Sequence, residues 1–367
     1  MKKTIVFISI IFTFVFLYGC GNEIAIDYEE NFIKSDFVET ELTDDFSYDI
    51  YEDYVEIVEY KGSEKEIKLP EKFQDKKIKS IGDYAFKNCN NLVSVKFSSS
   101  IIRIGQYAFS ECNNLGKVIF NNELIKISNN AFYKCPKLNN ITIPSGVKYI
   151  GHLAFYDCEN LEKISVPDTV SDIGAGAFKF TKWLENKNEE FVFAGDNVLV
   201  AYKGDKTEVT VPENTKQISA FYDCYDITNI NFNKGLESIG EMAFANCGQI
   251  KEIILPDGLI KINNSAFAWC GNLEKIVLPS TLKQISDTAF SDCSSIGKIT
   301  IPKNVKIFGD RIFQRCENLK EIIFENPKLE IKYKLFGNEN KSVVIISEDN
   351  SAISQYCKDN NYNFKNV

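Results

Sequence analysis

The sequence predicts an α/β repeat solenoid, in which short coils of one kind stack side by side. Three periodic features with a step of 23 residues carry this prediction. A phenylalanine recurs in each repeat, an apolar residue (usually isoleucine) precedes it by five positions, and a cysteine usually follows it by three. Because one repeat cannot bury this apolar stripe alone, neighbouring repeats must cover it. The phenylalanines are Phe86, Phe109, Phe132, Phe155, Phe178, Phe221, Phe244, Phe267, Phe290, Phe313 and Phe336, and the one longer step, from Phe178 to Phe221, is 43 residues.

The first 19 residues are expected to form a lipoprotein signal peptide. Two lysines precede an apolar run that has the length of a secretory signal and is short for a membrane span. The run ends in Leu17-Tyr18-Gly19-Cys20, which resembles the bacterial lipobox. This resemblance implies cleavage before Cys20 and a lipid on its sulfur, so that the chain meets the membrane through a lipid anchor only. A plain secretory signal and an uncleaved anchor are the alternatives.

Four further segments follow the signal peptide. Residues 20–45 contain nine Asp or Glu and one Lys, which is typical of a solvated, acidic tether. Residues 46–80 are expected to form an N-terminal cap and residues 337–367 a C-terminal cap. Both would cover the open ends of the solenoid, which spans residues 81–336.

Within one repeat, the sequence predicts a strand followed by a short helical segment. Ile141 and Ile143 alternate with polar residues as in a half-buried strand, and Pro144 ends it. Ile150 and Phe155 then follow at the spacing of a helical turn, with a glycine between them for a tight corner. We therefore expect these strands to lie in register along the stack, with a short helical or 3-10 turn in each coil.

The long step between Phe178 and Phe221 contains an insertion of 20 residues, within about residues 182–202. Two β-prone runs flank a Gly-Asp-Asn turn there, which predicts a hairpin that projects from the solenoid. Trp183, Phe191 and Phe193 are its candidate contact residues. The segment from Tyr202 resembles the one from Tyr60, so the solenoid is expected to restart after the insertion as it first starts.

The repeats resemble the BspA-like class of bacterial leucine-rich repeats, whose pattern is L-x-x-I-x-I-P-x-x-V-x-x-I-G-x-x-A-F-x-x-C. The segment from Leu138 to Cys158 matches this pattern almost letter for letter, and the resemblance covers about residues 60–336. It implies a curved leucine-rich-repeat stack displayed at a bacterial cell surface. The predicted strands would form a parallel β-sheet on the concave face of this stack, and the short helical or 3-10 turns would lie on its convex face. Many members of the class take part in adhesion or host interaction, and the class carries no catalytic residues.

Composition and residue types argue against most chemistry. The net charge of −9 argues against nucleic acid as a partner, because phosphate binding needs a basic stripe. His152 is the only histidine and occupies a slot that is mostly polar elsewhere, which predicts a solvent-exposed, non-catalytic residue. The repeat cysteines lack the spacing of zinc ligands and are expected to be buried thiols, although disulfides remain an alternative. We expect no enzyme activity, no cofactor and no metal.

The outward positions of the predicted strands form the candidate binding surface. They combine lysines with exposed isoleucine or valine, as at Ile119 and Ile254, which is typical of a protein-binding face. We expect an adhesin-like surface protein that recognises an extracellular protein or glycoprotein of a host or a neighbouring cell. The alternatives are a structural envelope lipoprotein without an external ligand and, third, a hydrolase with paired carboxylates in a cleft. The candidate ligand-binding residues on this face are Lys96, Lys117, Asn140, Lys163, Asn231, Lys275 and Lys298.

Overall fold

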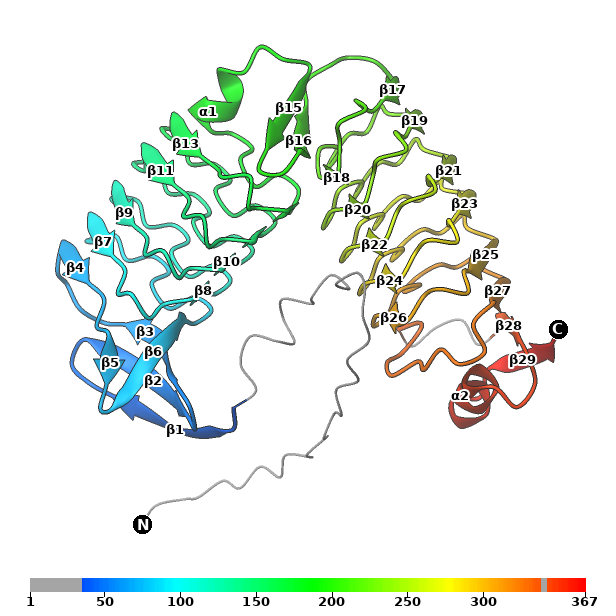
Figure 1. Ribbon diagram of the computed structural model, residues 1–367, viewed down its shortest axis with the longest axis horizontal. Helices are drawn as coiled ribbons and strands as arrows, with labels where there is room; N and C mark the ends of the chain where they lie inside the picture. Colours follow the sequence, from blue (N-terminus) through cyan, green and yellow to red (C-terminus); the bar gives the residue numbers. More distant parts are fainter. Residues whose placement is uncertain (1–34, 338–341) are drawn as a thin grey trace. The chain divides into compact units, whose positions relative to one another are not determined.

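The computed structural model describes residues 35–337 and 342–367 (Figure 1). The chain divides into two units, residues 1–34 and 35–367, and only the second is described. The predicted signal peptide, Cys20 and much of the predicted tether therefore lie outside the described residues. Within them, the predicted solenoid is confirmed: coils of 23 residues stack through parallel strands. No helix in this part of the chain is long and apolar enough to span a membrane.

One row of strands is here called the inner row. Each of its strands comes just before the position that usually holds glycine in a coil, here called the glycine slot, and neighbouring strands of the row pair continuously along each half of the stack. It belongs to two sheets, of nine and of seven strands, which meet at the insertion. Its strands are β6 (Lys76–Ile81), β8 (Arg103–Ile104), β10 (Lys126–Ile127), β12 (Tyr149–Ile150), β14 (Asp172–Ile173), β16 (Val198–Tyr202), β18 (Gln217–Ile218), β20 (Ser238–Ile239), β22 (Lys261–Ile262), β24 (Gln284–Ile285) and β26 (Ile307–Phe308).

The second row, here called the outer row, contains the strands that the alternating pattern predicts. It is divided into five short sheets: β4-β7-β9, β11-β13, β17-β19, β21-β23 and β25-β27-β28-β29. Its strands are β4 (Glu66–Lys68), β7 (Ser94–Lys96), β9 (Lys117–Ile119), β11 (Asn140–Thr142), β13 (Lys163–Ser165), β17 (Glu208–Thr210), β19 (Asn229–Asn231), β21 (Glu252–Ile254), β23 (Lys275–Val277), β25 (Lys298–Ile301), β27 (Glu321–Phe324), β28 (Val344–Ser347) and β29 (Asn363–Asn366).

The bend of the stack places the inner row, and not the predicted strands, on the concave side. Asn129 donates a hydrogen bond to Glu241 and Asn263 donates one to Asp172, each bypassing the coils between them. Only the inside of a bend brings distant coils so close. A sheet lies on the concave side, as expected, but the inner-row strands form it. The sequence analysis had wrongly assigned it to the outer-row strands. The outer row follows a longer arc, so its strands are farther apart. Hydrogen bonds between some neighbouring strands are therefore absent, and the row divides into separate sheets.

A shortened coil accompanies the bend. Between Ile218 and Phe221 two residues are missing relative to other repeats, where five positions separate the isoleucine from the phenylalanine. As a result, the coil of Phe221 does not separate its two neighbours at this point. The N–H of Ala175, in the coil before it, donates to the carbonyl of Glu241, in the coil after it, at 3.0 Å. The coils up to Phe178 are called the N-terminal arm and those from Phe221 onward the C-terminal arm.

Between the two rows, the predicted helical segment is a series of separate turns. Ala85 and Lys87 each bond back three residues, to Gly82 and Tyr84, as in a 3-10 turn. Tyr84 and Asn88 adopt positive φ, and later coils repeat this pair of left-handed residues. Because such residues interrupt a right-handed helix, the turns do not merge into one.

The core is a column of phenylalanine rings along the stack. Phe155 is fully buried and stacks on Phe132 with ring centroids 5.2 Å apart. The buried cysteines complete the column, since the thiol of Cys158 donates to the carbonyl of Phe132 at 3.1 Å. Seven coils repeat this bond, with sulfur–oxygen distances of 3.0 to 3.1 Å. The polar S–H group is thereby satisfied inside an apolar core.

The insertion is a hairpin that lies within the stack and does not project from it. Strand β15 (Phe191–Ala194) pairs antiparallel with β16, and β16 pairs parallel with β18 of the next coil. Alternate residues of β16 face different cores: Val198 and Val200 join that of the N-terminal arm and Leu199 that of the C-terminal arm. The short helix α1 (Lys182–Glu185) precedes the hairpin.

Both ends of the stack carry caps. At the N-terminal end, β1 (Phe37–Leu42), β2 (Phe46–Tyr51) and β3 (Val55–Tyr60) form an antiparallel meander that continues into β6, which also pairs with β5 (Lys72–Phe73). Strand β1 lies in the segment predicted to be tether, so the folded cap starts earlier than expected. At the C-terminal end, α2 (Ala352–Asn360) lies between β28 and the last strand, β29.

The insertion repeats the first cap in detail. The backbone N–H of Glu64 donates to the hydroxyl of Tyr60, and that of Lys206 donates to the hydroxyl of Tyr202. Each tyrosine also lies over the first buried phenylalanine of its arm, with ring centroids within 6 Å. The solenoid therefore restarts after the insertion in the way that it first starts.

Candidate functional site

The predicted binding residues all lie on outer-row strands, on the convex side of the bend. Their expected concave position is therefore wrong, because the concave strands are the shorter ones before the glycine slot. Their exposure is as predicted, and each side chain points to solvent from the first or third position of its strand. The residues are Lys96, Lys117, Asn140, Lys163, Asn231, Lys275 and Lys298.

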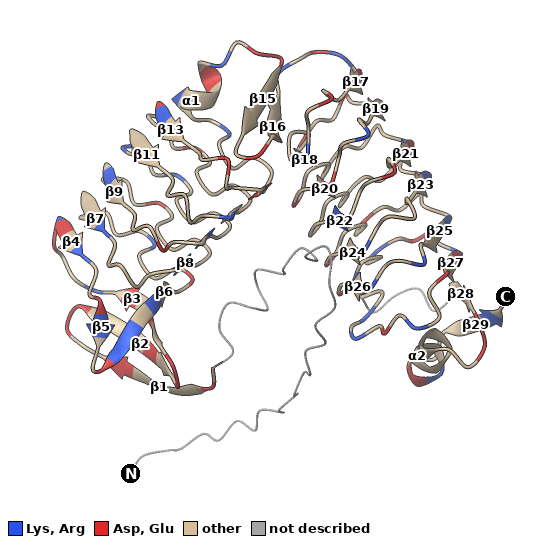
Figure 2. Cartoon of the chain, viewed as in Figure 1, with Lys and Arg blue, Asp and Glu red and all other residues tan. Residues whose placement is uncertain are grey.

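The lysines of the outer row differ between the two arms. In the C-terminal arm, Lys275 pairs with Glu252 at 2.6 Å and Lys298 with Glu321 at 2.9 Å. The hydrogen bond from Lys298 lowers the pKa of Glu321. In the N-terminal arm, Lys96, Lys117 and Lys163 have no carboxylate at ion-pair distance among the described residues. In Figure 2, where Lys and Arg are blue, strands β7, β9 and β13 carry blue segments. The N-terminal arm thus presents unneutralised ammonium groups.

Two grooves open where neighbouring outer-row strands do not pair. One, of about 580 Å³, lies between β9 and β11 and is lined by Lys117, Ile119, Asn140 and Pro144 among others. The other, of about 740 Å³, lies between β23 and β25 and is lined by Lys275, Val277 and Lys298 among others. Ile119 and Val277 are exposed. Each groove therefore places an exposed apolar side chain beside lysine, although the lining of the second groove also includes Glu274 and Glu325.

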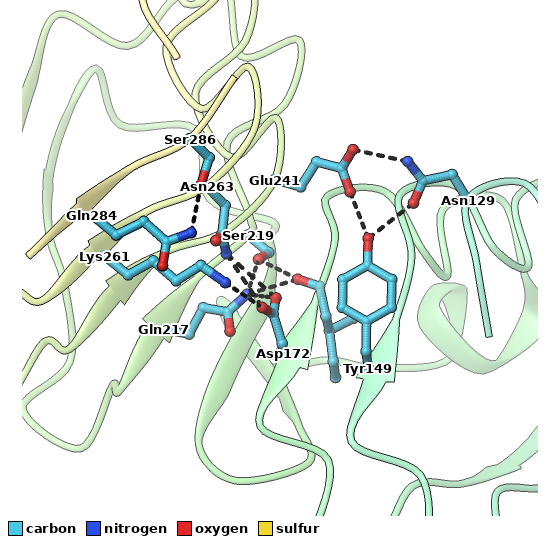
Figure 3. Close-up of polar contacts among 11 residues, drawn as sticks. Asn129, Tyr149, Asp172, Gln217, Ser219, Glu241, Lys261, Asn263, Gln284 and Ser286 are labelled. Carbon is cyan, nitrogen blue, oxygen red and sulfur yellow. Dashed lines mark hydrogen bonds and ion pairs between the residues drawn. The ribbon is translucent and has the colours of Figure 1, made fainter. Parts of the chain in front are cut away.

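The concave side at the bend holds a polar network that joins the two arms (Figure 3). The carboxylate of Asp172 accepts from Gln217 at 3.1 Å and from Asn263 at 3.4 Å, and lies 3.6 Å from the ammonium of Lys261. Asp172 and Gln217 are buried. Because buried hydrogen bonds to a charged group are strong, we expect this network to help hold the angle of the bend.

A second carboxylate joins the arms in the opposite direction. Glu241, from the C-terminal arm, accepts from Asn129 at 2.8 Å and from the hydroxyl of Tyr149 at 2.7 Å. Sequence analysis missed this network because its members belong to different repeats. The one available signal was the two-residue deletion before Phe221, which marks where the coil spacing changes.

His152 is buried, and the expectation of a solvent-exposed residue is wrong. Its Nδ1 lies 2.6 Å from the carbonyl of Ala175, and its ring meets the edge of Tyr222. Burial lowers the pKa of His152 to about 4. The slot is exposed or half-buried in most other coils, but here the ring is covered by residues of the coils that follow.

The aromatic residues of the insertion are packing residues and do not form a projecting surface. Trp183 is partly buried against the core of the N-terminal arm, with its ring 5.2 Å from that of Phe178. Phe191 and Phe193 pack against the core of the C-terminal arm. We therefore do not retain them as contacts for a partner.

The thiols of the repeats are chemically quiet. All ten cysteines in the described residues are free, and none is in a disulfide. Burial raises the pKa of Cys112 and of Cys270 to about 12, so the reactive thiolate is scarce at neutral pH. No group of three or more His, Cys, Asp or Glu in the described ranges is arranged to hold a metal ion.

Comparisons with known proteins agree with this architecture. The model of the BspA type leucine rich repeat region matches six copies, over residues 61–188, 201–311 and 239–365. A search of curated proteins found no significant match.

Among solved structures, a leucine rich repeat protein of T. pallidum is 22% identical, covering 77% of this chain and 91% of that chain, with a TM-score of 0.37. A leucine rich cell surface protein of Faecalibacterium prausnitzii is 20% identical, covering 84% and 97%, with a TM-score of 0.34. The pneumococcal vaccine antigen PcpA is 18% identical, covering 90% and 98%, with a TM-score of 0.37. These low scores add no argument of their own, but the six copies of the repeat span most of the chain. The chain belongs to the BspA-type leucine-rich repeat family.

Proposed function

We propose that this protein is a surface-anchored binding protein, which recognises an extracellular protein or glycoprotein through the outer row of its N-terminal arm. The observation that carries the proposal is the set of exposed lysines there, Lys96, Lys117 and Lys163, which have no carboxylate at ion-pair distance in the described structure. The chain as a whole has a net charge of −9, which keeps it soluble, while the local stripe of lysines attracts acidic partners.

The groove between β9 and β11 supports the same assignment. Its rim lysine, Lys117, lies beside the exposed Ile119, and the two unpaired strands leave backbone groups open to a partner. Interfaces of this kind combine an apolar centre with a polar rim. Because the repeat scaffold is rigid, its binding surface is already ordered, and little conformational entropy is lost when a partner binds.

Export and anchoring are part of the proposal. The lipobox-like segment before Cys20 supports lipidation of that cysteine and display on a bacterial membrane. Metabolic labelling with a radioactive fatty acid tests it: the wild-type chain is expected to carry label, and a Cys20→Ala variant is expected to carry none. Label in the variant would contradict the anchor without touching the binding proposal.

The binding proposal is tested with the soluble chain, residues 21–367, titrated over a panel of purified extracellular-matrix glycoproteins. We expect saturable binding to at least one of them with a Kd of about 10 μM or tighter. The affinity should fall as salt is raised, because exposed charges are screened. If no panel member binds at all, the structural envelope role gains the support that the binding role loses.

A further inference from the structure

Backbone hydrogen bonds are missing at the groove between β9 and β11, here called the β9/β11 groove. In a regular pair of coils, the N–H groups of Gly116 and Lys117 both donate to the carbonyl of Val93 in the coil before. The equivalent N–H groups one coil later belong to Asn139 and Asn140. In the described part of the chain, neither of them donates to the carbonyl of Gly116. The groove therefore offers backbone donors and acceptors to a ligand in addition to side chains.

Four neutral polar side chains line this groove. All four are exposed and can both donate and accept hydrogen bonds, and they are Asn122, Asn139, Asn140 and Thr142. The amide nitrogen of Asn140 donates to the amide oxygen of Asn139 at 2.7 Å. This bond leaves the amide oxygen of Asn140 and the amide nitrogen of Asn139 available for a ligand. The pair thus presents one acceptor and one donor side by side, which matches two neighbouring hydroxyl groups of a sugar ring.

Apolar surface lies beside these polar groups. The side chain of Ile119 is exposed at the groove and that of Pro144 is half-buried there. The carbon face of a sugar ring is apolar and packs against such side chains, while its hydroxyl groups reach the polar neighbours. An acidic peptide would present mainly carboxylates, which only accept hydrogen bonds and leave the acceptor oxygens of the lining without partners. The lining therefore favours a sugar chain over an acidic peptide.

The charged residues that line and flank the β9/β11 groove on its strands are lysines. Lys117 is the one charged residue in the lining. Lys96, on β7, lies in register beside Ile119, and Lys163, on β13, lies in register beside Asn140. Strands β7, β9, β11 and β13 follow one another along the N-terminal arm (Figure 1). The groove thus lies within a row of ammonium groups that attract carboxylates.

The second groove of the outer row differs in its charge. Between β23 and β25 the lining includes Glu274 and Glu325. Its two lysines, Lys275 and Lys298, are each paired with a glutamate of a neighbouring strand. Because the two grooves occupy equivalent places in the repeat, the repeat itself does not exclude carboxylates from such a lining. The charge of the β9/β11 groove is therefore specific to the N-terminal arm.

From these features we propose that the β9/β11 groove binds an acidic glycan, in which a sugar that carries a carboxylate alternates with a neutral sugar. This inference rests on the binding surface proposed above and names the part of a glycoprotein that occupies it. The neutral ring packs against Ile119 and bonds to the asparagine pair, and the carboxylates on either side reach lysines. Lys117 and Lys163 lie two strands apart, roughly 10 Å, so a chain along the stack meets them with alternate rings.

The test is calorimetric titration of the soluble chain, residues 21–367, with hyaluronan hexasaccharide, in which glucuronate alternates with N-acetylglucosamine. A neutral hexasaccharide of N-acetylglucosamine and the peptide hexaglutamate are the comparisons. We expect the acidic sugar to bind with a Kd below about 1 mM and the other two at least about tenfold more weakly. Asn139→Ala/Asn140→Ala should weaken the binding about fivefold or more. The matched control, Ser280→Ala/Thr300→Ala, changes two polar residues of the second groove and should leave the binding unchanged.

Four outcomes overturn the proposal. Absence of binding by the acidic sugar removes the glycan site, and equal binding of the neutral sugar removes the role of the lysines. Equal binding of hexaglutamate replaces the glycan by any polyanion, and full affinity in the asparagine variant places the sugar elsewhere. The matrix glycoproteins, titrated before and after enzymatic removal of their glycans, separate this proposal from the binding function. Equal binding in both states would leave the binding surface standing with a polypeptide ligand, whereas no binding in either state would remove both proposals.

Discussion

At the scale of single residues, burial in this stack follows the slot and the bend together. Phe155 is buried because its slot faces the core in every coil. His152 is buried because of where its coil lies, since Ala175 and Tyr222 cover it from the coils that the bend brings close. One repeat unit therefore supports different environments at equivalent positions.

The depressed pKa of His152 makes a prediction about stability and pH. Its folded-state pKa of about 4 lies below the ordinary value of 6.5. As pH falls through 6.5, the unfolded chain takes up a proton that the folded chain does not. The free energy of unfolding should therefore fall, with roughly 2–3 kcal/mol lost by pH 4.5 from this residue alone.

Urea unfolding of wild type and His152→Asn at pH 7.5 and pH 4.5 isolates this contribution, because the carboxylates titrate equally in both. The wild type should lose more stability than the variant across this range. Equal losses would show that His152 is accessible to protons in the folded state.

At the scale of elements, the glycine slot works through close packing of coils and not through unusual backbone angles. A Cβ at Gly174 would lie 2.3 Å from the backbone nitrogen of His152 in the preceding coil. Sequence reasoning found the glycine and placed it at a corner, but a single repeat cannot show what the next coil will press against it.

Gly174→Ala should therefore destabilise the protein by about 1–3 kcal/mol, as overpacking does. Gly248→Ala is the matched control, since a Cβ there meets nothing within 4 Å. Thermal unfolding of both variants checks the difference. If the two behave alike, the spacing of coils at this slot is looser than described.

The sequence predicted the repeat and its core, because the same apolar pattern recurs in each coil. It did not predict which strand row lies on the concave face. Both rows place isoleucine inward, so periodicity alone does not distinguish them. The polar network of Asp172 and Glu241 was equally out of reach, since its partners are about a hundred residues apart. Curvature is a property of the stack and not of the repeat.

At the scale of the whole solenoid, the two arms are held at their angle by carboxylates that reach across the bend. Asp172 and Glu241 each bind side chains of the opposite arm. The double variant Asp172→Ala/Glu241→Ala should let the arms open and raise the radius of gyration in small-angle X-ray scattering.

The control variant Asp168→Ala/Glu237→Ala removes one exposed carboxylate from each arm and should leave the radius unchanged. An unaltered radius in the first variant would mean that the bend is set by packing of the shortened coil alone.

The binding surface belongs to the same scale, because it is assembled from one residue in each of several coils. Its central measurement compares two charge reversals on the panel ligand that binds most tightly. Lys96→Glu/Lys117→Glu/Lys163→Glu changes the unneutralised lysines of the N-terminal arm. The control, Lys251→Glu/Lys275→Glu/Lys298→Glu, changes three exposed lysines of the C-terminal arm, namely the paired Lys275 and Lys298 and Lys251, which directly precedes β21. The first variant should lose at least about tenfold in affinity and the second less than about threefold. Full affinity in the first variant would contradict the assignment of the binding surface.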